Sequence, residues 1–166
     1  MISARLSPAV ALSILAFGPS AATAQEAPDV WSSGYQMGAF WAAVSTKGGD
    51  VLSFSCGEGG GPHVQKGASA RVVLASIKGQ AATRQKIEAQ FAADGLSVAL
   101  PMTASEGELT LGQGADPAAL AKLLGALRTA KTVSVAIEGV STSFASTGSS
   151  EALEGVAGCA KAQAKP

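Results

Sequence analysis

The sequence predicts an α+β domain, in which an antiparallel β-sheet of about six to eight strands carries two packed helices and one disulfide. Three patterns lead to this class: short segments of alternating apolar and polar residues between Gly-containing turns, one amphipathic helix, and a capped helix near the C-terminus. The chain has 166 residues, 47% of them hydrophobic, which suits a single domain expected over residues 37–161.

The first 24 residues have the layout of a secretory signal peptide. Arg5 supplies a positive charge, residues 8–17 are almost wholly apolar, and Ala22 and Ala24 are the small residues that signal peptidase requires. The apolar run is shorter than the roughly 20 residues of a membrane-spanning helix. Removal of the peptide near Ala24 predicts a periplasmic or secreted protein, with no transmembrane segment in the mature chain.

Residues 25–36 are polar and are expected to form a flexible lead-in. The first hairpin is predicted over Met37–Ser45 and Val51–Cys56, where apolar residues recur at every second position. A Gly-rich loop follows, and Ala70–Ile77 is predicted as a central strand because both of its faces are apolar.

The next segment is ambiguous between helix and strand. Residues 82–93 contain good helix formers, with Ile87 and Phe91 one helical turn apart. Ile87–Leu100 also alternates on both sides of Asp94-Gly95, a dipeptide typical of hairpin turns. The hairpin is favoured because both arms alternate. Glu108–Leu111 is predicted as a further short strand.

The clearest helix pattern covers Asp116–Ala130. Asp116 is a suitable N-cap, and Pro117 suits the first helical position. Four leucines at helical spacing form one apolar stripe and are predicted core residues: Leu120, Leu123, Leu124 and Leu127.

A second hairpin and a last helix complete the domain. Val133–Ile137 and Val140–Ser146 alternate around a Glu138-Gly139 turn. A helix over Glu151–Lys161, capped by Ser149 or Ser150, is expected to pack on the sheet, and residues 162–166 are expected to form a frayed tail.

The two cysteines, Cys56 and Cys159, both lie in the mature part of the chain. An even number of cysteines in an oxidising compartment favours a disulfide between them. The competing hypothesis is a catalytic thiol, because His63 follows Cys56 within a Gly-rich segment. That segment does not fix the geometry of the pair, and no third group is identifiable, so the disulfide is the prediction.

Charge and composition exclude several function classes. The 12 basic residues balance the 12 acidic residues, so the chain lacks the basic footprint of a nucleic-acid-binding protein. With one histidine, and with its cysteines expected to be bonded, the sequence predicts neither a metal site nor a cofactor. No Gly-x-Ser-x-Gly elbow or other catalytic constellation is present, so no catalytic residue is assigned.

Two segments are candidate contact sites. Half of the aromatic residues are crowded at the start of the mature chain, where Trp31 and Tyr35 either pack over the sheet or form an exposed patch. The Gly-rich segment is a candidate contact loop, with Gly59, Gly60, Pro62 and His63 at its centre.

Three segments together resemble a known group of proteins. They are Leu52–Cys56 after a Gly-Asp turn, the helix Ala118–Arg128 before the strand Val133–Ile137, and Phe144–Leu153 before Cys159. Their order resembles small exported bacterial proteins of uncharacterised function, and the layout is similar to that of periplasmic accessory proteins associated with type VI secretion. The resemblance implies an accessory role and supplies no catalytic residues.

These observations favour a non-enzymatic periplasmic module that binds another envelope protein or an envelope component. The alternative is an inhibitor of an envelope-lytic hydrolase, which would insert the Gly-rich loop into an active site. A thiol-dependent hydrolase that uses Cys56 and His63 is the third hypothesis.

Overall fold

The structure is a computed structural model that describes residues 28–59, 66–75, 85–105, 107–112 and 114–164. The described residues form nine strands: β1 (Ser32–Gln36), β2 (Ala39–Ser45), β3 (Val51–Gly57), β4 (Gly67–Val73), β5 (Gln85–Ala93), β6 (Leu96–Ser105), β7 (Glu108–Leu111), β8 (Thr132–Ile137) and β9 (Val140–Ala145). They also form three helices: α1 (Pro117–Leu127), α2 (Ser149–Ala152) and α3 (Glu154–Gln163). The predicted signal peptide lies outside the described residues.

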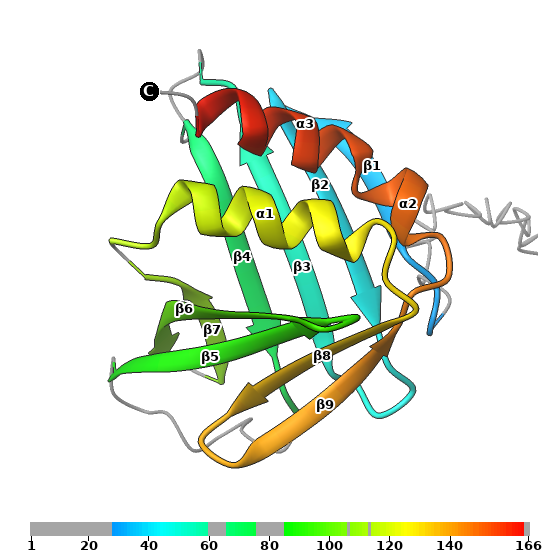
Figure 1. The fold of residues 1–166 in the computed structure, drawn as a ribbon, viewed down its shortest axis with the longest axis vertical. Helices are drawn as coiled ribbons and strands as arrows, with labels where there is room; N and C mark the ends of the chain where they lie inside the picture. The colour runs from blue at the N-terminus through cyan, green and yellow to red at the C-terminus, as the bar shows by residue number, and fades with distance from the viewer. Residues whose placement is uncertain (1–27, 60–65, 76–84, 106, 113, 165–166) are drawn as a thin grey trace, which may run out of the picture.

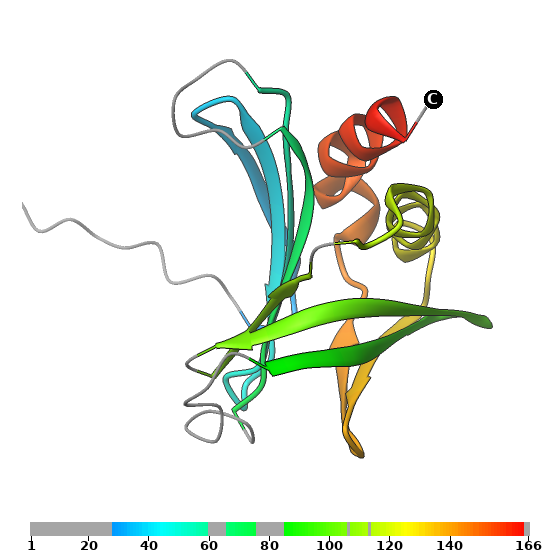
Figure 2. The same cartoon turned by 90° about the vertical axis from the view of Figure 1, so that its left-hand side faces the viewer.

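All nine strands belong to one antiparallel sheet, in the order β1-β2-β3-β4-β7-β6-β5-β8-β9. The short strand β7 pairs with β4 on one side and with β6 on the other, so it joins the two halves of the sheet. The sheet curves into a half-barrel, and α1 and α3 lie side by side within its concave side (Figures 1 and 2). Strand twist makes such curvature the normal outcome for a sheet of this width.

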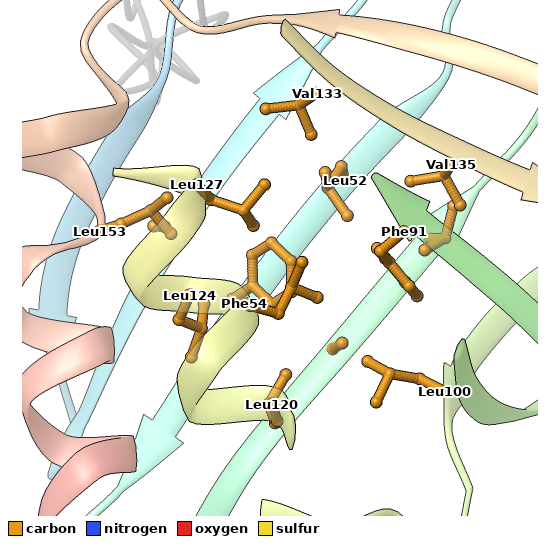
Figure 3. Close-up of a cluster of buried hydrophobic side chains, with 14 of the residues drawn as sticks. Leu52, Phe54, Phe91, Leu100, Leu120, Leu124, Leu127, Val133, Val135 and Leu153 are labelled. Atoms are coloured by element: carbon orange, nitrogen blue, oxygen red, sulfur yellow. The ribbon is translucent and has the colours of Figure 1, made fainter. Parts of the chain in front are cut away.

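The hydrophobic core fills the space between the concave face and the helices. On β3, for example, Leu52, Phe54 and Cys56 are buried, whereas the residues between them are partly exposed. Figure 3 shows Phe54 between the leucines of α1 and Phe91 of β5, with the two phenylalanine ring centroids 6.4 Å apart. The four predicted leucines of α1 are all buried, as the periodicity predicted.

Two parts of the predicted fold class are wrong. The sheet has nine strands rather than six to eight, because Ser32–Gln36 forms β1. This segment lies at the edge of the sheet, and most of its side chains are exposed. Its residues therefore do not alternate between apolar and polar, and its sequence gave no strand signal. The structure also has three helices rather than two.

The additional helix arises from a break in the last helical segment. A short helix, α2, begins after Gly148, which has a φ of 80°, and α3 begins after the buried Leu153. Neither Ser149 nor Ser150 is the cap, because the N-cap position of α2 is the glycine and no side chain caps it. Helix formers on both sides of the break concealed it in the sequence.

Within the ambiguous segment, Gln85–Ala93 forms a strand, and the hairpin prediction is confirmed. Strands β5 and β6 pair from Gln85 opposite Ala104 to Ala93 opposite Leu96 around the Asp94-Gly95 turn. Alternation decides this segment because Ala89, Phe91 and Ala93 are buried on one face of β5. A helix would have placed these residues around its circumference.

Candidate functional site

The predicted disulfide is confirmed. Cys56 in β3 and Cys159 in α3 are bonded, with their Cα atoms 6.0 Å apart, and both residues are buried. The bond joins α3 to the concave face of the sheet. A sulfur in a disulfide is not a thiolate, so Cys56 has no nucleophile to offer while the bond is intact. Its proposed partner, His63, lies outside the described residues.

The residues after Cys56 lead into the candidate contact loop. Gly59 has a φ of 79°, a conformation that favours glycine. Gly60, Pro62 and His63 lie outside the described residues, so the contact-loop hypothesis stays a prediction. On the described side of the loop, the Gly57 carbonyl accepts a 2.7 Å hydrogen bond from the Gln163 side chain of α3.

Trp31 is a structural residue. It is 5% exposed, and its ring stacks on Phe54 with 6.3 Å between the ring centroids. Its indole N–H donates to the Ala145 carbonyl at 2.8 Å, and its backbone N–H donates to the Thr147 carbonyl at 2.9 Å. Trp31 therefore holds the start of β1 against the end of β9, where the two edges of the half-barrel meet.

Tyr35 differs from Trp31 because it is 58% exposed. It lies on β1 opposite Phe40 of β2, and the two rings are 4.7 Å apart between centroids. The next turn carries Met37, which is 72% exposed. Together, Tyr35 and Met37 form an apolar tip at the end of the β1–β2 hairpin, which we call the β1 tip.

Met37 also has an unusual backbone conformation. Its φ is 52° and that of Gly38 is 85°, both in the left-handed region. A two-residue hairpin turn requires such angles, and Asn or Asp followed by Gly is the usual solution. A long side chain without a local hydrogen-bonding group is uncommon there and costs conformational energy. The sequence prediction placed Met37 at the start of the strand Met37–Ser45, because the segment before it gave no strand signal and the Met37-Gly38 turn could not be recognised without it.

Two other hairpins of the sheet have the same backbone turn with acidic residues in place of methionine. Asp94 has a φ of 41° and Glu138 a φ of 48°, and a glycine follows each of them. The Asp94 carboxylate accepts hydrogen bonds from the backbone N–H groups of Lys131 and Thr132, at 2.8 and 3.3 Å. The hydrogen bond from the Lys131 N–H is the main reason that the pKa of Asp94 is lowered. Asp94 thus has a structural use that Met37 lacks.

The main charged feature of the described sheet is an ion pair on its convex face. Arg71 of β4 contacts the carboxylate of Glu108 of β7 through two nitrogens. The hydrogen bond from Arg71 is the main cause that lowers the pKa of Glu108, and the same bond raises the pKa of Arg71. Within the described residues, no group of three or more His, Cys, Asp or Glu side chains is placed to hold a metal ion.

Comparison with known proteins gives one match. The model of the YfjT family matches residues 29–153, which is most of the chain. The protein belongs to the YfjT family. The match includes β1 and ends at Leu153, before α3. The family name carries no activity with it, and no curated protein and no solved structure shows significant similarity to the chain.

The part of the chain that the structure describes contains no helix of the length and apolar character needed to cross a membrane.

Proposed function

We propose that this YfjT-family protein is a non-enzymatic binding module of the cell envelope, exported by its N-terminal signal peptide, and that the β1 tip contacts its partner. The observation that carries the proposal is Met37, an exposed apolar side chain held in a backbone conformation that favours other residues. Strained residues persist where the surrounding structure or a function requires them, and methionine suits adaptable binding surfaces.

The partner in this proposal is an extended segment of another envelope protein. β1 is an end strand of the sheet, and along Ser33–Gln36 its outer edge pairs with no other strand among the described residues. The free N–H and C=O groups of such an edge match the backbone of an added strand. Natural edges are commonly protected by charged residues or proline, and β1 has neither.

The resemblance of the sequence to secretion-associated accessory proteins extends the proposal. It supports an accessory role beside a secretion apparatus, with the partner among the envelope components of that apparatus. The alternative, inhibition of an envelope-lytic hydrolase, would use the loop after Cys56 rather than the β1 tip. The two functions therefore require different surfaces of the protein.

Site-specific photo-crosslinking in cells tests the proposal. A photoreactive residue is placed at position 37, and, as the matched control, at position 138 in the corresponding turn at the other edge of the sheet. We expect one discrete protein adduct from position 37 and none from position 138. Mass spectrometry should map the adduct to an extended segment of the partner.

Purified components provide the second measurement. Met37→Asn suits the left-handed turn, so it should preserve or raise stability while it weakens binding of the crosslinked partner at least about tenfold. Glu138→Asn should leave binding unchanged. Unaltered affinity of the Met37→Asn protein, adducts only with a second copy of the chain, or equal adducts from both turns would each overturn the proposal. A photoreactive residue at position 59, in the loop after Cys56, tests the alternative: adducts of this position with a hydrolase, and none from position 37, would favour the inhibitor hypothesis instead.

A further inference from the structure

The convex face of the sheet contains a hollow of about 190 Å³. It lies across β2, β3, β4 and β7, on the opposite face from the helices, and the outward side chains that line it are Trp41, Ser53, Ser55, Ser69, Arg71 and Thr110. The hollow is separate from the β1 tip. Tyr35 pairs with Phe40, which is on the concave side of β2, whereas the next residue, Trp41, faces the convex side.

The strand register builds this hollow. One cross-strand row runs from Trp41 through Ser55 to Ser69, and the adjacent row runs from Ser53 through Arg71 to Thr110. The serines are small and the tryptophan and arginine are large, so the hollow lies over the serines, with Trp41 at the end of the first row and Arg71 in the middle of the second. A hollow of this kind places hydroxyl groups at its floor, between an aromatic ring and a guanidinium.

Gly34 allows the indole of Trp41 to take its position. The two residues are cross-strand partners, and a Cβ atom added at Gly34 would lie 2.8–2.9 Å from three indole ring atoms. The ring therefore lies over the β1 backbone and leaves the serine floor open. Trp41 is only partly buried, and it is one of the residues that line the hollow.

The polar groups of the hollow are locally neutral and incompletely used. Arg71 and Glu108 neutralise each other, and the guanidinium keeps N–H donors that the carboxylate does not occupy. The hydroxyls of Ser53 and Thr110 make long contacts of 3.5 Å to backbone carbonyls. Contacts of this length are weak, so both hydroxyls can turn toward a ligand.

We propose that this hollow binds one ring of a neutral saccharide. A pyranose has an apolar C–H face that suits an indole, and hydroxyl groups that both donate and accept hydrogen bonds, as the serine floor and the Arg71–Glu108 pair do. An anionic ligand finds no unpaired cation in the lining, and a wholly apolar one would leave the polar floor unsatisfied. The site goes beyond the proposed protein-binding function and occupies another face of the sheet.

Nuclear magnetic resonance of the two indole N–H groups tests the proposal on the full mature protein. Trp31 is buried and hydrogen-bonded, so its signal is an internal control for Trp41. The signals are assigned with Trp41→Phe. Titration with chitotriose and with maltotriose separates an amino-sugar glycan from a glucan as the source of the ring. We expect at least one of them to shift the Trp41 signal saturably, with a Kd of about 1 mM, while the Trp31 signal stays in place.

A matched pair of variants locates the binding. Ser55→Leu fills the hollow, and Ser143→Leu makes the same change on the outward face of β9, away from the hollow. Ser55→Leu should raise the Kd at least about tenfold, and Ser143→Leu should leave it unchanged. Three results would overturn the proposal. Neither saccharide shifts the Trp41 signal even at concentrations well above the millimolar range, both variants bind equally, or only glucuronate oligomers bind. Loss of the β1-tip adduct would leave this result untouched, since the two tests use different residues.

Discussion

The concave and the convex faces of the sheet are made by the same strands, yet they differ in almost every chemical respect. On β3, Leu52 and Phe54 point inward and are essentially fully buried, whereas Ser53 and Ser55 point outward and are partly exposed. Helices cover the inner face (Figure 2), and the Cys56–Cys159 disulfide joins α3 to it. Around the hollow, the outer face carries serines and a threonine, Trp41 and the Arg71–Glu108 ion pair. Stability should therefore depend on the inner face, and the outer face should be free to serve binding.

The largest expected effect concerns the disulfide of the inner face. Replacing both cysteines with alanine should lower the free energy of unfolding by about 4 kcal/mol, because the bond spans 103 residues of the chain. Urea unfolding of the wild type and the variant measures the loss. The wild type in reducing agent is the control and should match the variant. Equal free energies for the oxidised and reduced wild type would contradict the prediction.

Two substitutions in α1 compare the buried side of the helix with its exposed side. Leu124→Ala should cost about 3 kcal/mol, since the side chain is fully buried against the concave face. Lys122→Ala, on the exposed side of α1, should change the free energy of unfolding by less than about 0.5 kcal/mol. Similar unfolding midpoints for the two variants would show that the helix does not rest on the core.

Two glycines of α3 should respond with opposite signs to the same substitution. A Cβ atom at Gly155 would lie 2.5–3.0 Å from ring atoms of Phe40, so Gly155→Ala should destabilise the protein by about 1–3 kcal/mol. A Cβ atom added at Gly158 would meet no atom of another element within 4 Å, so Gly158→Ala should stabilise the protein by about 0.5–1 kcal/mol. Thermal unfolding of both variants measures the difference. If both substitutions changed the stability in the same direction, α3 would have to pack on the sheet differently from the structure.

The smallest expected effect belongs to the outer face. Glu108→Gln should cost less than about 1 kcal/mol near neutral pH, because the pair with Arg71 is solvent-exposed. The pKa of Glu108 is lowered in the folded protein, so the stability that the carboxylate contributes is present above its usual pKa of 4.5 and is lost as the pH falls through the lowered value.

The pH dependence gives this prediction its test. The difference in free energy of unfolding between wild type and Glu108→Gln should shrink as the pH is lowered from about 7 to about 3, and high salt should reduce it at neutral pH. A difference that is the same at both pH values would show that the carboxylate contributes through packing rather than through its charge.

Local patterns account for the parts of the fold that the sequence predicted well. Each of these parts depends on residues that are close together in the chain, so the local sequence is enough to predict it. They are the α1 stripe, the alternation of β5 and β6, and the turns at Asp94-Gly95 and Glu138-Gly139. The disulfide was also predictable, because the chain has two cysteines and these allow a single pairing. The candidate site was predicted less well: Tyr35 was named, but Met37 and the Trp41 hollow were not.

The sequence by itself determined which residues alternate, where α1 begins and which cysteines pair, because each depends on local periodicity or on a choice with one answer. Only the tertiary structure decided that Ser32–Gln36 joins the sheet as β1, and that Trp31 is buried while Tyr35 is exposed. The hydrogen bond that places Trp31 links residues 114 positions apart, and no local pattern records such a contact. The hollow depends likewise on a register across four strands, which forms only when the sheet is complete.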